Sequence, residues 1–247
     1  MQFDKEFITR VTKLKPSWLT RGILSVEDKI YGFGTDTKIL SRIFEVLTYP
    51  IVADIAENNS LTIEIPKKQN IYPDFTLYHN KEDKNKIAVD VKTTYRKYVN
   101  NPFKFTLGSY TSFLRDNTKN ILYPYDHYAE HWVIGFVYER DTAGSRSTAL
   151  VELKDRKKVL PPYKDVDWFV QQKYKIAGDR AGSGNTANMG SICAKIEDFK
   201  KGVGPFSKLG EHVFRQYWAN YMNGKRKPYY DLTGYSKWKK AKKKDKF

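Results

Sequence analysis

The chain has 247 residues, a formal net charge of +16 and an aromatic content of 15%. It is long enough for a sizeable core in one large or two small domains. A basic, aromatic-rich composition favours a polyanionic partner, most often nucleic acid. Cys193 is the only cysteine, so an intramolecular disulfide is excluded and a reducing cytoplasm is the expected location. No apolar run approaches the roughly 20 residues of a membrane helix, and there is no zinc-finger spacing, P-loop or dinucleotide fingerprint.

Two helices are predicted in the first part of the chain. Residues 7–14 carry apolar side chains at helical spacing, and Pro16 ends that helix. A second helix begins at a cap, Thr35 or Asp36, and is expected to end before Pro50. Its apolar face would consist of Ile39, Leu40, Ile43, Phe44 and Leu47.

The middle of the chain is rich in strand patterns. The predicted strands are 75–78, 87–93, 132–138, 166–177 and 192–196, with helices at 111–120 and from a cap at Ser207. Strands flanked by helices indicate an α/β or α+β fold, with a central mixed β-sheet covered by helices. Because no linker divides the chain, we expect one domain over residues 1–224 and a basic tail over residues 225–247.

Two short segments carry the clearest chemical signal, Pro73-Asp74 and, after fifteen residues, Asp90-Val91-Lys92. The polar stretch 79–85 suits a hairpin, and antiparallel pairing would bring Asp74 close to Asp90. Alternate residues of a strand share a face, so Asp90 and Lys92 point the same way. A hard cation such as Mg²⁺ is well served by two aspartates and a substrate phosphate. The lysine adds the positive charge that metal-assisted phosphodiester hydrolysis needs.

The same pattern has a plainer explanation. Two ordinary surface strands with scattered charges would also contain P-D and D-x-K, because such short motifs often arise by chance. Glu45 is a candidate third carboxylate, since it lies beside the apolar stripe of the second helix and could reach inward. Most glutamates at such positions are only solvated.

A glycine-rich loop, Ala181 to Asn188, separates the last two predicted strands. Glycine allows close approach of the backbone to a partner, and asparagine and threonine offer donors and acceptors at short reach. Asparagine can bond an adenine edge in the major groove, so the loop is a candidate for reading DNA bases. An isolated loop of this kind is otherwise a surface turn. The polar cluster 67–70 precedes Pro73-Asp74 and suits contact with the minor groove or the phosphate backbone.

The last residues, 225–247, are strongly basic. They contain ten Lys or Arg and two Asp, a net charge of +8, which is half of the excess of the whole chain. Such tails are usually solvated, and the expected use of this one is non-specific attraction to phosphates.

Several of these segments together resemble one protein family. They are Gly34–Lys38 with Ile43–Glu45, Asn70–Tyr78, Ile87–Tyr95, Phe105–Asn120 and Ile176–Ser191. The chain resembles the type II restriction endonucleases of the PD-(D/E)xK superfamily from about Gly22 to Trp218. The resemblance implies a PD-(D/E)xK core and a homodimer that cuts both strands of double-stranded DNA with Mg²⁺. It also implies the palindrome GATATC as the target, cut to blunt ends.

The resemblance also implies roles for individual residues. Asp74 and Asp90 would be metal ligands, Lys92 the catalytic lysine and Glu45 an auxiliary acid that also serves the metal. The remaining contacts would be with DNA: Gly182, Ser183, Gly184, Asn185 and Thr186 in a major-groove loop, Gln69 and Asn70 at the minor groove, Thr93, Thr94 and Tyr95 near the cut, and Lys38, Ser112 and Lys119 toward phosphates. Lys68, Ile71 and Ala187 depart from the family pattern, so the flanking preference is open.

Two other functions fit parts of the sequence. A basic DNA-binding protein without catalysis would use the fold as a scaffold, and the intact Asp74, Asp90 and Lys92 set argues against it. A structure-directed nuclease would cut junctions or damaged DNA regardless of sequence, and the recognition loop argues for a defined duplex site instead. A site-specific nuclease in the cytoplasm of a bacterium also implies a cognate DNA methyltransferase that protects the host genome.

Overall fold

The computed structural model describes residues 1–145, 150–182, 187–222 and 227–244. The chain divides into two compact units. The first consists of Met1–Leu61, Val91–Phe103 and Ile134–Val170, and the second of Thr62–Asp90, Lys104–Val133 and Gln171–Phe247. Two long strands, β5 (Lys86–Arg96) and β7 (Tyr128–Arg140), continue from one unit into the other. Among the described residues, no helix is both long and apolar enough to cross a membrane.

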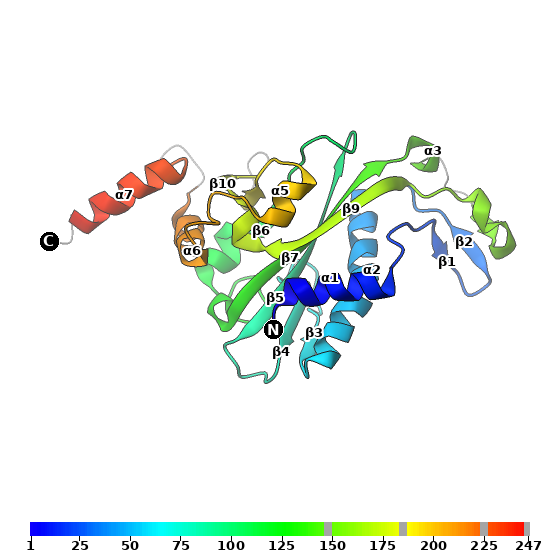
Figure 1. Ribbon diagram of the computed structural model, residues 1–247, viewed down its shortest axis with the longest axis horizontal. Helices are drawn as coiled ribbons and strands as arrows, with labels where there is room; N and C mark the ends of the chain where they lie inside the picture. The colour runs from blue at the N-terminus through cyan, green and yellow to red at the C-terminus, as the bar shows by residue number, and fades with distance from the viewer. Residues whose placement is uncertain (146–149, 183–186, 223–226, 245–247) are drawn as a thin grey trace. The chain divides into compact units, whose positions relative to one another are not determined.

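The first unit contains the two long helices of the N-terminal part of the chain (Figure 1). Its elements are α1 (Phe3–Leu14), β1 (Ile23–Leu24), β2 (Lys29–Tyr31), α2 (Thr37–Asn58), α3 (Thr142–Ser145), β8 (Leu150–Glu152), a 3₁₀-helix (Leu153–Lys158) and most of β9 (Tyr163–Gln172). Strands β1, β2 and β8 form a small antiparallel sheet in that order. The predicted opening helix is confirmed, and its buried side chains are Phe3, Phe7 and Val11.

Helix α2 differs from its prediction at its end. Asp36 is the cap, as expected, and its Oδ1 accepts from the backbone N–H of Lys38 at 2.8 Å and of Ile39 at 3.1 Å. The prediction that the helix ends before Pro50 is wrong, because α2 continues to Asn58 with Pro50 inside it. A proline removes one helical hydrogen bond. The four buried side chains that follow it hold the second half of the helix in the core: Ile51, Val52, Ile55 and Ala56.

Aromatic rings form the core of the first unit. Phe44 of α2 is fully buried and stacks on Phe136 of β7 with ring centroids 4.6 Å apart. It also meets Tyr163 of β9 at 5.4 Å, while Phe7 of α1 packs edge-on against Trp168 of β9. Helices α1 and α2 are therefore fixed to the strands by large side chains, each of which contributes a large apolar area.

The second unit carries most of the remaining elements. They are β3 (Thr62–Glu64), β4 (Phe75–Tyr78), β6 (Thr106–Ser109), a π-helix (Tyr110–Leu114), a 3₁₀-helix (Tyr125–His127), α4 (Lys173–Ile176), β10 (Ala177–Ala181), β11 (Asn188–Ser191), α5 (Ile196–Lys201), α6 (Glu211–Asn220) and α7 (Leu232–Lys244). The central sheet has five strands in the order β3-β4-β5-β7-β9, and a smaller one has the order β10-β11-β6. The predicted α/β class, a central sheet accompanied by helices, is confirmed.

Several predicted boundaries in this unit are wrong. Residues 173–176, predicted as strand, form the short helix α4, and residues 192–196 follow β11 without continuing it. The helix predicted from Ser207 starts at Glu211, after Gly210, whose φ of +83° is available to glycine at little cost. The helix predicted over 111–120 is present only as far as residue 116: the π-helix ends at Leu114, two helical residues follow, and residues 117–120 form bends and a turn.

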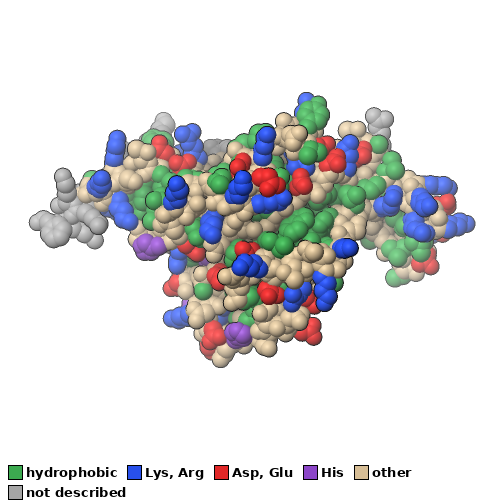
Figure 2. All heavy atoms as spheres, viewed as in Figure 1, with side chains coloured by type: hydrophobic (Ala, Val, Ile, Leu, Met, Phe, Trp, Pro, Cys, Tyr) green, Lys and Arg blue, Asp and Glu red, His purple; other side chains and the backbone are tan. Residues whose placement is uncertain are grey.

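The basic C-terminal segment contains packed structure. Within it, α7 carries Tyr235, which is buried, and Trp238, whose ring lies 5.3 Å from that of Tyr229. The Tyr229 hydroxyl donates to the backbone carbonyl of Tyr217 on α6 at 2.5 Å. Lysine side chains gather along the visible face of α7 (Figure 2). An aromatic cluster thus holds a helix whose outer surface is cationic.

Candidate active site

The register between β4 and β5 sets the geometry of the acidic pair. The two strands are antiparallel, and Phe75 pairs with Val89. Asp74 immediately precedes β4 and Asp90 follows Val89 in β5, so continuing this register by one residue places Asp74 opposite Asp90. Opposed residues of an antiparallel pair have Cβ atoms about 4.5–5.5 Å apart and share a face of the sheet. The hairpin expected from the sequence is present, and it brings the two carboxylates together.

Asp90 is buried, whereas on a surface strand with one exposed face it would be accessible to solvent. Only 3% of the residue is exposed, and its neighbours Val89 and Val91 are buried as well. The ammonium Nζ of Lys173, on α4, lies 3.4 Å from Asp90 Oδ2. Asp74 is half-buried and immediately precedes β4. A buried carboxylate beside a buried ammonium is partly neutralised, which reduces the cost of removing both charges from water.

The residues that follow Asp90 on β5 belong to the first unit. Lys92 is half-buried, and its Nζ donates to the carbonyl of Val91 at 3.3 Å. The side chain of Tyr95 is 49% exposed, and the guanidinium of Arg140 stacks 3.7 Å above its ring centroid. A cation stacked on a tyrosine keeps its remaining N–H donors available, which suits a phosphate contact.

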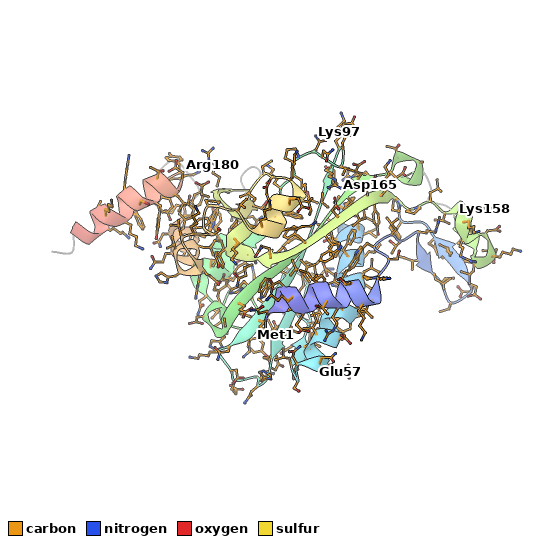
Figure 3. All side chains as sticks on the ribbon, in the orientation of Figure 1. Met1, Glu57, Lys97, Lys158, Asp165 and Arg180 are labelled. Carbon is orange, nitrogen blue, oxygen red and sulfur yellow. The ribbon has the colours of Figure 1, made fainter. Side chains whose placement is uncertain are left out.

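An ion pair anchors the end of β5. Arg96 donates through Nη2 to the carbonyl of Asp165 at 3.0 Å and to the carboxylate of Asp167 at 2.7 Å, both on β9. Figure 3 labels Asp165 and also Lys97, the residue directly after this anchor. The strand that carries Lys92, Thr93 and Thr94 is thereby held at its far end within the first unit.

Glu45 lies on α2, next to the fully buried Phe44. Its carboxylate forms an ion pair with Arg42, one turn earlier on the same helix, and 18% of its side chain is exposed. The position beside the apolar stripe agrees with the sequence analysis. The pairing with Arg42 was not predicted, although the three-residue separation is one at which helical side chains meet.

The acidic pair can supply two oxygen ligands to a hard cation. Among the described residues there is no group of three or more His, Cys, Asp or Glu that could hold a metal ion. Mg²⁺ is commonly bound by one or two carboxylates together with substrate phosphates and waters. Asp74 and Asp90, opposed on neighbouring strands, fit that donor set.

The candidate recognition loop connects two paired strands. Strands β10 and β11 are antiparallel, and Ala181 pairs with Met189. At the base of the loop, the N–H of Gly182 donates to the carbonyl of Asn188 at 2.8 Å. Residues Ser183, Gly184, Asn185 and Thr186 lie outside the described residues. Arg180, labelled in Figure 3, is the exposed residue of β10.

The other proposed DNA contacts are distributed over both units. Lys38, Gln69, Asn70 and Lys119 are exposed, as a phosphate or groove contact requires. Asn70 has a φ of +66°, a left-handed conformation that asparagine adopts more readily than most residues. Ser112 is 5% exposed, and its backbone N–H donates to Ser109 Oγ at 3.3 Å.

A buried polar cluster surrounds Lys173, and it was not predicted from the sequence. His131 is stacked on Tyr125 with centroids 4.1 Å apart, and its Nδ1 shares a hydrogen bond with the Tyr72 hydroxyl at 2.8 Å. His131 Nε2 lies 3.7 Å from Glu211 Oε1. Burial raises the pKa of Glu211 to about 7, and burial beside the Lys173 charge holds the pKa of His131 well below its ordinary value.

No local pattern would have revealed this cluster. Its members come from the segment before β4, from β7, from α4 and from α6, far apart in the sequence. Lysine and glutamate are among the residues least often buried. Only the fold shows that Lys173 is enclosed and that Glu211 lies beside the buried His131.

Comparisons with known proteins agree with the motifs. A family model described as restriction endonuclease EcoRV matches residues 15–240. The type II restriction enzyme EcoRV of Escherichia coli is 48% identical over 220 residues, which are 88% of this chain and 89% of that protein. Among solved structures, the NlaIV restriction endonuclease is 14% identical with a TM-score of 0.35, over 96% of this chain and 89% of that one. The chain belongs to the EcoRV family of restriction endonucleases.

Proposed function

We propose that the protein is an Mg²⁺-dependent, site-specific deoxyribonuclease that cuts both strands of GATATC at the centre and leaves blunt ends. The observation that carries the proposal is the opposed pair Asp74 and Asp90, in a chain of the EcoRV family. Lys92 follows Asp90 by two residues on the same strand, and its charge completes the set that phosphodiester hydrolysis needs.

In the proposed mechanism, Asp74 and Asp90 hold the metal ion and Glu45 acts as an auxiliary acid. A bound Mg²⁺ would supply Lewis-acid activation of water for in-line attack and charge neutralisation at the phosphate. Lys92 stabilises the negative charge that develops on phosphorus. No covalent enzyme intermediate is formed. The burial of Asp90 and the anchoring of strand β5 would hold Asp90 and Lys92 in position.

We assign the remaining candidates to DNA binding. Gly182, Ser183, Gly184, Asn185 and Thr186 would read the major groove, and Gln69 and Asn70 would contact the minor groove. Thr93, Thr94 and Tyr95 would contact the backbone near the cut, and Lys38, Ser112 and Lys119 would support the phosphate contacts. A two-fold homodimer would present the same loop to each half of the palindrome. The central TA step is easily unstacked, so bending there adds specificity.

The proposed function also has a biological requirement. A nuclease of this specificity in a bacterial cytoplasm needs a cognate methyltransferase that modifies the same sequence in the host genome. The two enzymes act on the same DNA site and need no complex with each other.

The experiment is digestion of a plasmid of known sequence by the purified protein, in Mg²⁺ and in EDTA, followed by sequencing of the ends. Blunt ends inside GATATC that appear only with Mg²⁺ support the proposal. Cuts at another palindrome keep the chemistry and show that Lys68, Ile71 or Ala187 alters the site that is read. DNA binding without cleavage would instead favour a non-catalytic protein, and cutting of branched substrates regardless of sequence a structure-directed nuclease.

A further inference from the structure

Lys173 occupies a position where lysine is rarely found. It is fully buried on the short helix α4, and its neighbour in the chain, Tyr174, is only half-buried. A lysine ammonium is seldom enclosed unless a carboxylate or an aromatic face compensates for lost water. Lys173 has both a carboxylate and an aromatic face beside it, and all three groups belong to the second unit.

Two contacts compensate the charge of Lys173. Its Nζ lies 3.4 Å from Asp90 Oδ2, and 3.8 Å from the centroid of the Tyr72 ring. The Phe113 ring is 5.5 Å away. A cation over a tyrosine ring is attracted by the negative face of the ring, and more strongly when water is excluded. Lys173 therefore contacts Asp90, one member of the acidic pair. It also contacts Tyr72, which lies two residues before Asp74, the other member.

We propose that Lys173 is a positioning residue of the metal site: a resident counter-ion that holds Asp90 in place and limits how tightly the acidic pair binds a divalent cation. The inference rests on the proposed role of Asp74 and Asp90 as metal ligands. Two cations that share one carboxylate repel each other, and the repulsion is larger in a buried site than in water.

A purely structural role for Lys173 would have a different consequence. Removal of a structural ion pair destabilises the fold and leaves the affinity for a cation unchanged. Removal of a resident counter-ion leaves the acidic pair with more negative charge, so the affinity for a divalent cation rises. The two roles are therefore separated by a binding measurement that needs neither DNA nor catalysis.

The experiment measures Mn²⁺ binding to the full-length protein without DNA, by electron paramagnetic resonance titration of the free ion. Lys173→Met is expected to bind Mn²⁺ about tenfold more tightly than the wild type, because a fixed positive charge has been removed close to the site. Lys173→Arg keeps the charge and is expected to keep the wild-type affinity. Lys175→Met is the matched control, since it removes a lysine from the same helix whose Nζ lies near Tyr174.

An affinity of folded Lys173→Met equal to or weaker than that of the wild type overturns the inference. A failure of the metal site itself looks different. If Asp74→Asn binds Mn²⁺ as the wild type does, the proposed ligands are wrong and the proposed function fails with them. If Lys173→Met, like the wild type, binds no Mn²⁺ without DNA, Lys173 does not limit the affinity and the inference alone is overturned, because the proposed site can still bind a metal ion together with a substrate phosphate.

Failure of Lys173→Met to fold is also informative. Folding that occurs only when Mn²⁺ is present supports the inference, because the ion then replaces the missing ammonium. If the variant folds in neither condition, ¹H–¹⁵N spectra of the lysine ammonium groups of the wild type decide. The Lys173 signal, identified by its loss in Lys173→Arg, is expected to shift on saturation with Mg²⁺. An unchanged signal overturns the inference.

Discussion

Phe75 on β4 pairs with Val89 on β5, and this single pair fixes the position of the two acidic side chains. A shift of one residue in the register would turn Asp74 and Asp90 to opposite faces of the sheet. Both Phe75 and Val89 are buried, so the apolar core enforces the register that the acidic pair requires. The packing of the sheet therefore also positions the acidic pair that we propose as the metal site.

The two aspartates are expected to differ in their effect on stability. Asp74→Asn and Asp90→Asn should both reduce DNA cleavage by several orders of magnitude. Asp90→Asn should also lower the free energy of unfolding by about 3–5 kcal/mol, because it leaves the buried Lys173 charge without the carboxylate opposite it. Asp74→Asn should lower it less, since Asp74 is half-buried. Urea denaturation of both variants checks this, and equal losses would contradict it.

Glu211 is expected to make stability depend on pH. Its pKa in the folded protein is about 7, above the ordinary value of 4.5, because of burial. The folded state therefore keeps a proton that the unfolded state releases. Its contribution to stability is fully present below pH 4.5 and is lost as the pH rises through 7.

The variant Glu211→Gln isolates this effect. The difference in unfolding free energy, variant minus wild type, should grow by on the order of 3 kcal/mol between pH 4.5 and 7. Burial shifts the pKa of His131 in the opposite direction, but His131 is common to both proteins, so its titration largely cancels in the difference. Urea denaturation across this pH range measures the effect. A difference that is constant with pH would show that Glu211 titrates normally.

The exposed lysines of α7 are expected to supply non-specific affinity for DNA. Replacing Lys237, Lys240 and Lys242 by glutamine should weaken binding to non-cognate DNA and reduce the salt slope by up to about 0.9 for each phosphate that is no longer neutralised. The cleaved sequence should not change. Lys84→Gln, on the β4–β5 hairpin, is the control. Binding measured at several salt concentrations tests this, and an unchanged slope would exclude a DNA role for α7.

Truncation after Tyr235 should have the same effect on DNA binding and an additional cost in stability. It removes six net positive charges together with Trp238, whose ring packs against Tyr229 and Tyr235. The charge variants keep this packing. Comparison of the two therefore separates the effect of charge from the effect of aromatic packing.

Pro50 is expected to weaken α2. Pro50→Ala restores a backbone donor in the helix interior and should raise the free energy of unfolding by about 1–2 kcal/mol, after allowance for the more flexible unfolded chain. Pro16→Ala is the control, because Pro16 lies beyond the end of α1 and is expected to give no gain. Thermal unfolding of both variants measures the difference. An equal effect at the two positions would show that Pro50 costs the helix nothing.

The sequence predicts best those elements whose information is local. The strand from Ile87 alternates and is bounded by polar residues, so the prediction of β5 and its hairpin is correct. The Asp36 cap is predicted from a side chain that can accept from nearby N–H groups. In both cases the deciding atoms lie within a few residues of one another.

The errors arise where tertiary packing overrides a local rule. Pro50 normally ends a helix, but the buried residues after it keep α2 intact. The segment 166–177 is predicted as one strand, whereas Lys173 begins a helix and its charge is paired with Asp90. The partner that explains Lys173 is distant in the sequence, so no window of residues contains the information.

The base of the candidate recognition hairpin is held by backbone atoms. Gly182 bonds to the carbonyl of Asn188, and the N–H of Tyr110 donates to the carbonyl of Ala187 at 2.9 Å. These bonds do not depend on which side chain the bonded residue carries. Residues between the two ends can therefore be exchanged while the frame persists. Under the proposed function, in which this loop reads the target that a methyltransferase must also recognise, the loop would be a replaceable part and new specificities could arise from an unchanged scaffold.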